Sequence, residues 1–563
     1  MHDEVIISDM STCIPQEAFS RSRKKYCWQL IEYEAEGNTK GILMSAGPET
    51  EAPDVVCRLG LDGWYAIYIG LWGRKDPLVA NLDIGMIKVR LKDDPCFTSI
   101  RSEAQDLGSI EETFWKYANL TNQHLVIGQR KKGVKNTASI AYMRLVPLSS
   151  KSARQIQLDW KEKKHKKLIA ANDAFGIFFY NRITEEEEIW EYVEPFRNTD
   201  FGMVFWEMSS GWFGEAPGSR IYGQDVQDFP RLLDRNVSES YRILNAKGID
   251  PLATAMNYSH EIGLEFHVSQ RMEWFQAAPP YEELFTTDFY AAHPEYRLVD
   301  REGTEVTGMS YAFPEVRRYM ISLFGKAASC GADGVAAVFS KAPPFLLYEG
   351  PLVDGFKKEF GVDPREMDEN DETWLSFRGR FMTQFMRELR EEMDKVGKKL
   401  KRRLQVSAMV LATRDVNIFF GLDPEAWIEE GLVDNLIPYP RRIFYPAVFD
   451  RYPVEIDMAY FARITKGTDC RIYPNVLPKQ MPARDYRAKA LGYYSAGADG
   501  LFFWDTYKRH INTAQWTTLR RLGHIEELRA SSNNDSDTQE PKLIKIARLG
   551  GHNMRRYSPN RGG

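Results

Sequence analysis

The hydrophobic pattern of the chain changes near residue 160. Before that point apolar and polar residues alternate in short runs, at 64–70, 86–91 and 138–146, with Gly, Asp and Pro between them. A period of two is typical of strands with one buried face, and helical periodicity is scarce here. We therefore predict an antiparallel β-sandwich over residues 1–150. Residues 151–172 are predicted to be a charged linker, with a solvated helical connector at 159–167.

Beyond the linker, short apolar runs alternate with segments of helical period, which is typical of parallel βα units. Five amphipathic stretches, at 316–328, 374–396, 455–464, 486–496 and 513–528, are the predicted helices. The predicted strands are 175–180, 203–208, 263–268, 334–339, 404–410, 435–438, 471–474 and 500–504. This pattern predicts an α/β fold class, a (β/α)8 TIM barrel at 173–530 preceded by the N-terminal β-sandwich domain.

A repeated turn sequence and the C-terminal segment complete the predicted organisation. The sequence GADG occurs at 331–334 and again at 497–500, before the fourth and eighth predicted strands, where we expect a helix-to-strand turn with glycine in a left-handed conformation. Residues 531–563 are predicted to be a polar linker and a C-terminal tail, and the part from 543 to 557 is expected to dock back onto the protein.

Carboxylates follow several of the predicted strands. Barrel active sites lie where the strands end, and cleavage of a glycosidic bond needs two carboxyl groups, one acid and one base or nucleophile. Glu207 ends the second strand and Asp505 follows the eighth, so they are the first candidates for catalysis. Glu265, on the third strand, is the next, although a buried ion pair with Arg271 is its alternative role.

Aromatic and basic residues accompany these carboxylates. Sugar rings stack on aromatic faces while their hydroxyls bond to charged groups, so a mixed rim suits a carbohydrate. For His267 the alternative is a hydrogen-bonded histidine inside the barrel, and for Lys341 it is a Schiff base of the aldolase type. The predicted substrate-binding residues are Trp206, Trp212, His267, Arg271, Lys341, Tyr439 and Trp504.

Composition narrows the classes of partner. The 563 residues carry 74 Lys and Arg against 79 Asp and Glu, a net charge of −5, which favours neither nucleic acid nor a membrane surface as a partner. Without a secretory leader or an apolar run long enough to cross a bilayer, a cytoplasmic location is expected. The six cysteines form no CxxC, the nine histidines form no HxH or HExxH, and glycine-rich phosphate loops are missing, so we predict no metal and no cofactor.

Several segments resemble one family. They are HPEYRLVDREGTEVTGMSYAFPEVRRYM at 293–320, the GADGV turn, residues 343–389, GLDPEAWIEEGLVDNLIPYP at 421–440 and the terminal RYSPNRGG. Together they resemble the glycosyl-hydrolase-like barrel proteins of planctomycete-type bacteria, and GWYAIYIGLW and DDPCF resemble the β-sandwich that precedes that barrel. The resemblance implies a carbohydrate-active barrel whose substrate is an oligosaccharide or glycoside.

One departure from the family pattern opens a second hypothesis. The resemblance implies an acidic residue on the fourth strand, where this chain has Val338, and the seventh strand does not end in a carboxylate. A valine side chain cannot transfer a proton. The first hypothesis is therefore a glycoside hydrolase that uses its rim carboxylates. The alternative is a non-catalytic saccharide-binding barrel, and the oligomeric state stays open.

Overall fold

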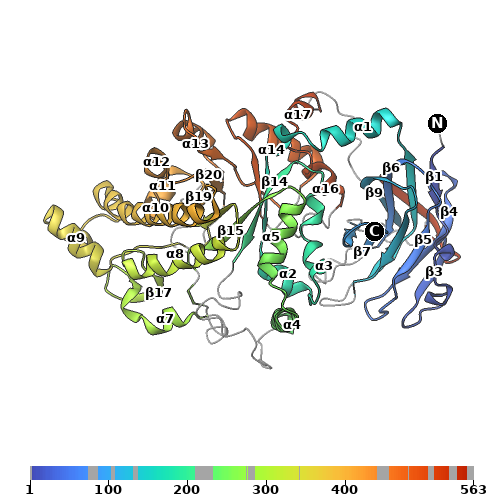
Figure 1. The fold of residues 1–563 in the computed structure, drawn as a ribbon, viewed down its shortest axis with the longest axis horizontal. Helices are drawn as coiled ribbons and strands as arrows, with labels where there is room; N and C mark the ends of the chain where they lie inside the picture. The colour runs from blue at the N-terminus through green and yellow to red at the C-terminus, as the bar shows by residue number, and fades with distance from the viewer. Residues whose placement is uncertain are drawn as a thin grey trace, which may run out of the picture.

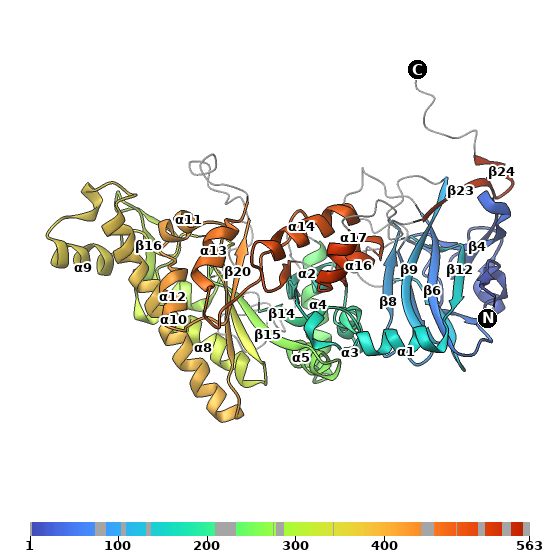
Figure 2. The same cartoon turned by 90° about the horizontal axis from the view of Figure 1, so that it is seen from above.

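A sandwich of two β-sheets and a larger barrel lie side by side in the computed structural model (Figure 1). The barrel occupies the left of the view and the sandwich the right, and Figure 2 shows the same separation from above. The structure describes residues 3–73, 86–102, 108–130, 137–208, 232–273, 275–276, 286–341, 343–440, 455–479, 481–504, 513–531 and 542–554.

The larger sheet of the sandwich has ten strands. Eight follow one another in the order β1-β12-β6-β9-β23-β3-β4-β11, while β2 pairs with β3 and β24 pairs with β23. Their bounds are β1 (Val5–Ile7), β2 (Phe19–Ser20), β3 (Trp28–Ala35), β4 (Lys40–Ala46), β6 (Trp64–Trp72), β9 (Ser109–Asn119), β11 (Ala138–Ile140), β12 (Tyr142–Pro147), β23 (Lys542–Leu549) and β24 (His552–Asn553).

The smaller sheet is antiparallel and has the order β5-β10-β7-β8. Its strands are β5 (Val55–Arg58), β7 (Met86–Leu91), β8 (Thr98–Arg101) and β10 (His124–Gly128). Trp28 and Ile67 of the larger sheet and Ile127 of the smaller one are fully buried in one core, so the predicted sandwich is confirmed.

The last long strand of the chain lies in the middle of the larger sheet. The first half of β23 pairs with β9, where Leu543 lies opposite Glu111, and its second half pairs with β3, where Ile546 lies opposite Ala35. Ile544 and Ile546 are buried there. The far end of the sequence thus joins the two halves of this sheet.

Eight parallel strands form the barrel, with β22 next to β13 at one end of the order and β21 at the other. They are β13 (Leu168–Asn172), β14 (Phe201–Glu207), β15 (Glu265–Arg271), β18 (Gly334–Val338), β19 (Gln405–Leu411), β20 (Asn435–Tyr439), β21 (Arg471–Ile472) and β22 (Leu501–Phe503). Beyond β21 the ring closes through a bridge between Asn475 and Phe502, whose N–H donates to the carbonyl of Pro474 at 3.1 Å. The predicted barrel is confirmed.

The first barrel strand is not the predicted one. Residues 175–180 belong to helix α2 (Ala174–Tyr180), and the strand is β13, which lies inside the predicted linker. Every residue of β13 is buried, and Ile177 and Phe178 of α2 are buried as well. Because both segments are mostly apolar, hydrophobicity does not distinguish strand from helix at this point.

Helices cover the outside of the barrel. Helix α1 (Ser150–Asp159) is the connector, so the helix predicted at 159–167 is wrong in position, and only the 3-10 turn η4 (Lys163–His165) lies there. The others are α3 (Glu186–Trp190), α4 (Leu232–Ala246), α5 (Pro251–Glu261), α7 (Asp288–Ala292), α8 (Pro314–Ser329), α9 (Gly350–Phe360), α10 (Glu372–Leu400), α11 (Arg414–Phe419), α12 (Pro424–Glu429), α13 (Met458–Thr465), α14 (Ala483–Ser495), α16 (Thr513–Leu519) and α17 (Ile525–Ser531). A hairpin of β16 (Arg297–Val299) and β17 (Glu305–Met309) lies before α8.

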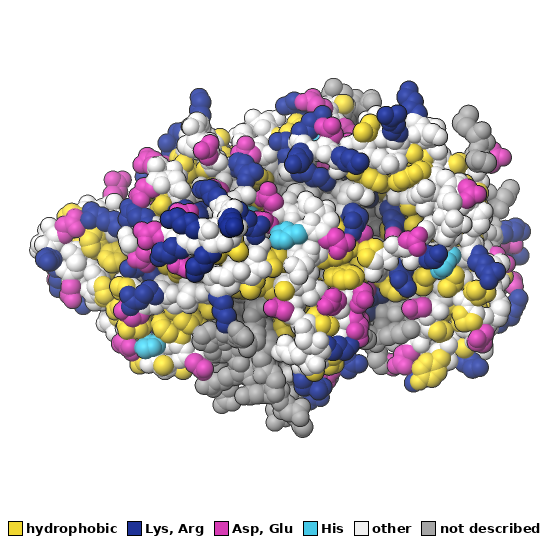
Figure 3. Space-filling model, in the orientation of Figure 1, with side chains coloured by type: hydrophobic (Ala, Val, Ile, Leu, Met, Phe, Trp, Pro, Cys, Tyr) yellow, Lys and Arg dark blue, Asp and Glu magenta, His cyan; other side chains and the backbone are white. Residues whose placement is uncertain are grey.

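Alternate side chains of the barrel strands enter two separate cores. One set, with Phe205 and Val338, packs inside the barrel, and the other, with Trp206 and Phe339, packs between strands and helices. On the face seen in Figure 3, basic and acidic side chains are interspersed. Within the described ranges, no helix has the length and apolar character that crossing a membrane requires.

Candidate active site

The last residues of two neighbouring barrel strands meet at one end of the barrel. Glu207 ends β14 and Arg271 ends β15, so both lie at the C-terminal end of the strands. Glu207 follows the interior residue Phe205 by two positions, and side chains alternate along a strand, so Glu207 points to the interior as well. This end is where barrel enzymes place their chemistry.

Glu207, Arg271 and Asp173 form one charged group. The Arg271 guanidinium makes a short ion pair with Glu207 through Nε, and its Nη2 donates to Glu207 Oε2 at 3.3 Å and to Asp173 Oδ2 at 3.4 Å. The Glu207 side chain is 1% exposed, whereas those of Arg271 and Asp173 are each 18% exposed. One arginine therefore holds two carboxylates at the mouth, one of them sealed from solvent.

Burial dominates the protonation of Glu207. The pKa of its carboxyl is raised to about 8, chiefly by loss of hydration; the nearby charges of Asp173 and Glu273 add to the rise, while Arg271 and Lys341 oppose it. The same three carboxylates raise the pKa of Arg271, although its own burial lowers it. Glu207 can therefore give and take a proton near neutral pH, as an acid catalyst must.

Lys341 and two aromatic rings are also at this end. The Lys341 Nζ lies 3.6 Å from the centre of the Trp504 ring and 5.2 Å from that of Tyr439, and the two rings meet edge to face at 6.2 Å. Both aromatic side chains are almost completely buried. The ammonium covers the face of the Trp504 ring in a cation–π contact, so a sugar can stack on that face only if Lys341 moves.

Of the buried polar atoms that have no hydrogen-bond partner among the described residues, two lie shortly after strands and concern this end of the barrel. They are the Ser340 Oγ, just after β18, and the Asn475 Nδ2, just after β21. Ser340 follows the interior residue Val338 by two positions, and Asn475 accepts from the Trp504 N–H at 3.2 Å through its other side-chain atom. Buried polar groups are rarely left unpaired, so these two atoms mark room for water or a ligand hydroxyl.

Glu265 does not belong to this group, which corrects its prediction as a catalytic residue. It is the first residue of β15, at the opposite end of the strand from Arg271, and its carboxylate accepts from Gln405 Nε2 at 2.8 Å. Six residues of strand separate the two positions by about 20 Å. The ion pair with Arg271 that the sequence left open is absent for the same reason.

His267 lies inside the barrel and does not line its mouth. Its ring stacks on Phe205 with centres 5.1 Å apart, and its Nδ1 is 3.3 Å from the Ser407 hydroxyl. Burial lowers its pKa to about 3, so the ring is neutral. His267 is thus a histidine of the barrel interior, the alternative role that its place in the sequence allowed.

Trp206 points away from the barrel interior. Its neighbours in sequence, Phe205 and Glu207, face inward, and Trp206 is buried in the core between the strands and the helices. A sugar cannot reach it there, which corrects its prediction as a stacking surface. Trp212 and Asp505 lie outside the described residues.

Asp173 is the residue that sequence reasoning missed. It lies between β13 and α2, and its Oδ1 caps the helix by accepting from the Gly176 N–H at 3.2 Å while Oδ2 faces Arg271. A carboxylate before a helix is a common cap, and the first strand was assigned to the wrong side of it. The signal was the short apolar run LIAA at 168–171, which directly precedes Asn172 and Asp173 after a charged segment.

Comparisons with known proteins assign no family. No family model and no curated protein matches the chain. Among solved structures, an alpha-L-fucosidase isoenzyme 2 from Paenibacillus thiaminolyticus is 12% identical over 65% of this chain and 50% of its own, with a TM-score of 0.38. The beta-galactosidase of the psychrophilic Marinomonas ef1 is 12% identical over 66% of this chain and 61% of its own, with a TM-score of 0.39.

The alpha-galactosidase of Thermus thermophilus, in complex with p-nitrophenyl alpha-D-galactopyranoside, is 13% identical over 88% of this chain and 94% of its own, with a TM-score of 0.34. This chain spans only half of the fucosidase and 61% of the Marinomonas enzyme. With TM-scores below 0.5, these likenesses carry no argument about function, and the fold stands on the strand order and the closed ring described above.

Proposed function

We propose that this protein is a carbohydrate-active barrel that cleaves a glycosidic bond, with Glu207 as the proton donor. The observation that carries the proposal is a fully buried carboxyl at the C-terminal end of the barrel whose pKa is raised to about 8. A carboxyl that keeps its proton at neutral pH can protonate a leaving group. The substrate class comes from the resemblance of the barrel segments to glycosyl-hydrolase-like proteins.

The second carboxylate has two candidates. Asp173 is held beside Glu207 by the same Arg271 nitrogen and is partly exposed, and Asp505 directly follows Trp504 in the sequence. A base or nucleophile must be an ionised carboxylate, and Asp173 has a positive partner in Arg271, whose Nη2 donates to it at 3.4 Å. Lys341 and Arg271 supply donors for substrate hydroxyls or for an acidic sugar.

The test is a screen of neutral, acidic and sulfated oligosaccharides with product analysis, followed by variants on any substrate that is cleaved. Glu207→Gln should lower kcat by about 10²–10⁴-fold, since it removes the acid but keeps the shape. Asp173→Asn and Asp505→Asn identify the second carboxylate by which of them lowers kcat. The wild-type rate should fall as the pH rises past about 8, when Glu207 loses its proton.

Glu265→Gln is the matched control. It makes the same chemical change on the neighbouring strand, at the other end of the barrel, and should leave kcat unchanged. The proposal is wrong if Glu207→Gln keeps the wild-type rate, or if Glu265→Gln lowers it as much.

A barrel that binds saccharides without cleaving them is the second candidate. Val338 is fully buried inside the barrel and ends β18, on the strand where the family resemblance implies an acidic residue. Saturable calorimetric binding with no product after long incubation would favour this function. Release of reducing ends in proportion to protein concentration would exclude it.

A further inference from the structure

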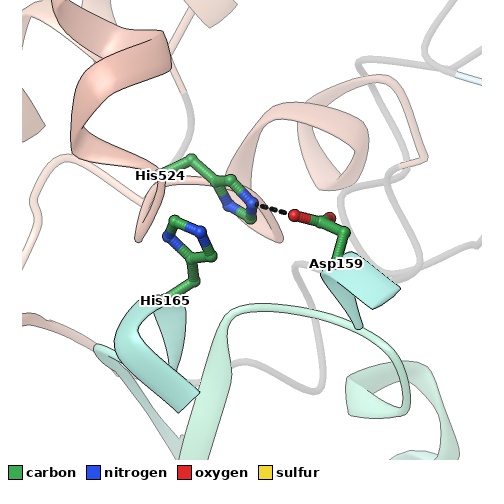
Figure 4. A group of neighbouring side chains, drawn as sticks. All are labelled: Asp159, His165 and His524. Atoms are coloured by element: carbon green, nitrogen blue, oxygen red, sulfur yellow. Dashed lines mark hydrogen bonds and ion pairs between the residues drawn. The ribbon is translucent and has the colours of Figure 1, made fainter. Parts of the chain in front are cut away.

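Three side chains from two distant parts of the chain converge at the junction between connector and barrel. Asp159 ends helix α1, His165 ends the turn η4, and His524 lies between α16 and α17. One potential ligand atom from each lies within 4.8 Å of the other two, and Figure 4 shows the two imidazole rings face to face beside the carboxylate. In the described part of the chain, this is the one such group of three.

The outer contacts of this group already have the form of a metal site. Asp200, just before β14, accepts from His524 Nδ1 at 2.7 Å, which leaves Nε2 directed at Asp159 Oδ1, 2.8 Å away. Arg521 Nη1 donates to the other oxygen of Asp159 at 2.9 Å. A carboxylate on the far nitrogen of a histidine is the usual support of a zinc ligand, because it fixes the ring and its tautomer.

His165 completes the set. Its ring stacks on His524 with centres 3.7 Å apart and an angle of 11° between planes. No hydrogen bond among the described residues holds the ring, and it is partly exposed, so it can turn about its Cβ–Cγ bond to direct a nitrogen at the same point. Around zinc the three ligand atoms would lie about 3.4 Å from one another. His524 Nε2 and Asp159 Oδ1, now 2.8 Å apart, would separate slightly, and a His165 nitrogen, within 4.8 Å of both, would move closer.

We propose that Asp159, His165 and His524 bind a divalent zinc ion, with water as the fourth ligand. Asp200 supports His524, and Arg521 supports Asp159. Binding replaces the proton shared by His524 Nε2 and Asp159 Oδ1, which leaves to solvent while Nε2 and the carboxylate oxygen bond to the metal. Two histidines, one carboxylate and an open position are a common zinc set.

The position of the site assigns the metal a structural role, although a water as fourth ligand is the form that catalytic zinc sites take. Asp200 precedes β14 and its carbonyl accepts from the N–H of Leu168, the first residue of β13, so the group lies at the N-terminal end of the barrel, opposite Glu207. Features at that end of a barrel serve stability. The ion would join the connector from the sandwich to the segment that follows α16. No short sequence motif indicates this site, because His524 is more than 300 residues from the other two ligands.

The experiment uses the untagged full-length chain after removal of metals with a chelator. Isothermal titration with ZnCl2 should show one ion per chain, and saturating zinc should raise the thermal midpoint by several degrees. His165→Ala should weaken binding at least 100-fold and abolish the thermal shift while the chain still folds, because the Asp159–His524–Asp200 hydrogen bonds remain. Asp200→Asn should weaken binding about 10–100-fold, as expected for a residue that only orients a ligand.

His293→Ala is the matched control, because His293 also lies beside a carboxylate, Glu295 at 2.9 Å, on the outside of the barrel. It should bind zinc as the wild type does. Cobalt in place of zinc gives an independent readout, since a tetrahedral site with nitrogen ligands produces intense visible absorption that aqueous cobalt lacks. The proposal is overturned if the wild type binds no zinc, or if His165→Ala binds it as tightly as the wild type.

Discussion

Two titratable residues inside the barrel show how partners decide protonation. Glu207 and His267 are both fully buried on adjacent strands. Glu207 has Arg271 within hydrogen-bonding distance, so the charged form has a partner that opposes the effect of burial. His267 stacks on the ring of Phe205 and faces the Ser407 hydroxyl, and the distant charge of Asp333 opposes burial only weakly, so its pKa falls to about 3.

This difference predicts how stability depends on pH. The unfolded chain binds a proton at His267 below a pH of about 6.5 and the folded chain does so only near pH 3, so the free energy of unfolding falls as the pH drops through that window. The contribution is complete above pH 6.5, and about 2 kcal/mol of it is lost by pH 5.

The variant that tests this is His267→Gln, which keeps a polar group near Ser407 but cannot titrate. Urea unfolding at pH 7 and pH 5 should show a smaller loss of stability for the variant than for the wild type. His260→Gln, at a partly exposed histidine that pairs with Asp333, is the control for loss of a histidine elsewhere. Equal losses in His267→Gln and the wild type would contradict the assignment.

At the scale of elements, one contact recurs between neighbouring strands. Asp333 before β18, Asp434 before β20 and Asp499 before β22 each exchange two hydrogen bonds with the strand beside them. The Asp499 carboxylate accepts from the Ile472 N–H at 2.9 Å, and the Asp499 N–H donates to the Ile472 carbonyl at 3.0 Å. Phe266 with Asp333 and Val406 with Asp434 repeat the arrangement.

The two GADG segments therefore form a hydrogen bond to the neighbouring strand as well as a turn. Gly331 and Gly497 have φ angles of 116° and 101°, so the predicted positive φ is confirmed. The aspartate that follows each turn then satisfies an N–H at the start of the neighbouring strand. Sequence pointed to the turn but not to this contact, because the partner strand is distant along the chain.

Removing one of these carboxylates should show how much its hydrogen bond contributes to the free energy of unfolding. Asp499→Ala leaves the Ile472 N–H buried without an acceptor and should lower the free energy of unfolding by about 1–3 kcal/mol. Asp499→Asn retains a carbonyl oxygen in the same place and should lower it less. Urea unfolding followed by circular dichroism compares the two, and an equal loss in both variants would show that the hydrogen bond is not the cause.

At the scale of the whole molecule, the two ends of the chain depend on each other. Strand β23 lies between β9 and β3, so its absence would expose backbone groups on both of them. Unpaired strand edges promote aggregation. The partly buried ion pair of Lys88 with Glu191 and the hydrogen bond from Arg520 to the Trp115 carbonyl also join sandwich to barrel, so loss of structure in one part should destabilise the other.

A truncation tests this dependence. A chain that ends at residue 531 lacks β23 and should be recovered mainly as aggregate, or unfold at a clearly lower temperature than the full chain. A chain that ends at residue 554 keeps β23 and β24 and is the control, with an expected midpoint close to that of the full chain. Normal solubility and stability of the shorter chain would show that the sandwich closes without its C-terminal strand.

Local patterns in the sequence determined the class of fold. The period of two before residue 150, the alternation of apolar runs with helical segments after it and the GADG turns indicated a sandwich and a barrel, because each is a property of neighbouring residues. They also indicated Glu207, Arg271, Lys341, Tyr439 and Trp504 as residues near the ends of strands, and the structure places all five at the same end of the barrel.

Which side chains meet was decided only by the tertiary structure. Trp206 faces the outer core because it is one residue from Glu207, and Glu265 is remote because it begins the strand that Arg271 ends. Asp173 joins the site through Arg271, and Asp159, His165 and His524 meet across most of the chain length. Such contacts depend on strand register and ring closure, which no local pattern encodes, because they arise from the packing of the complete chain.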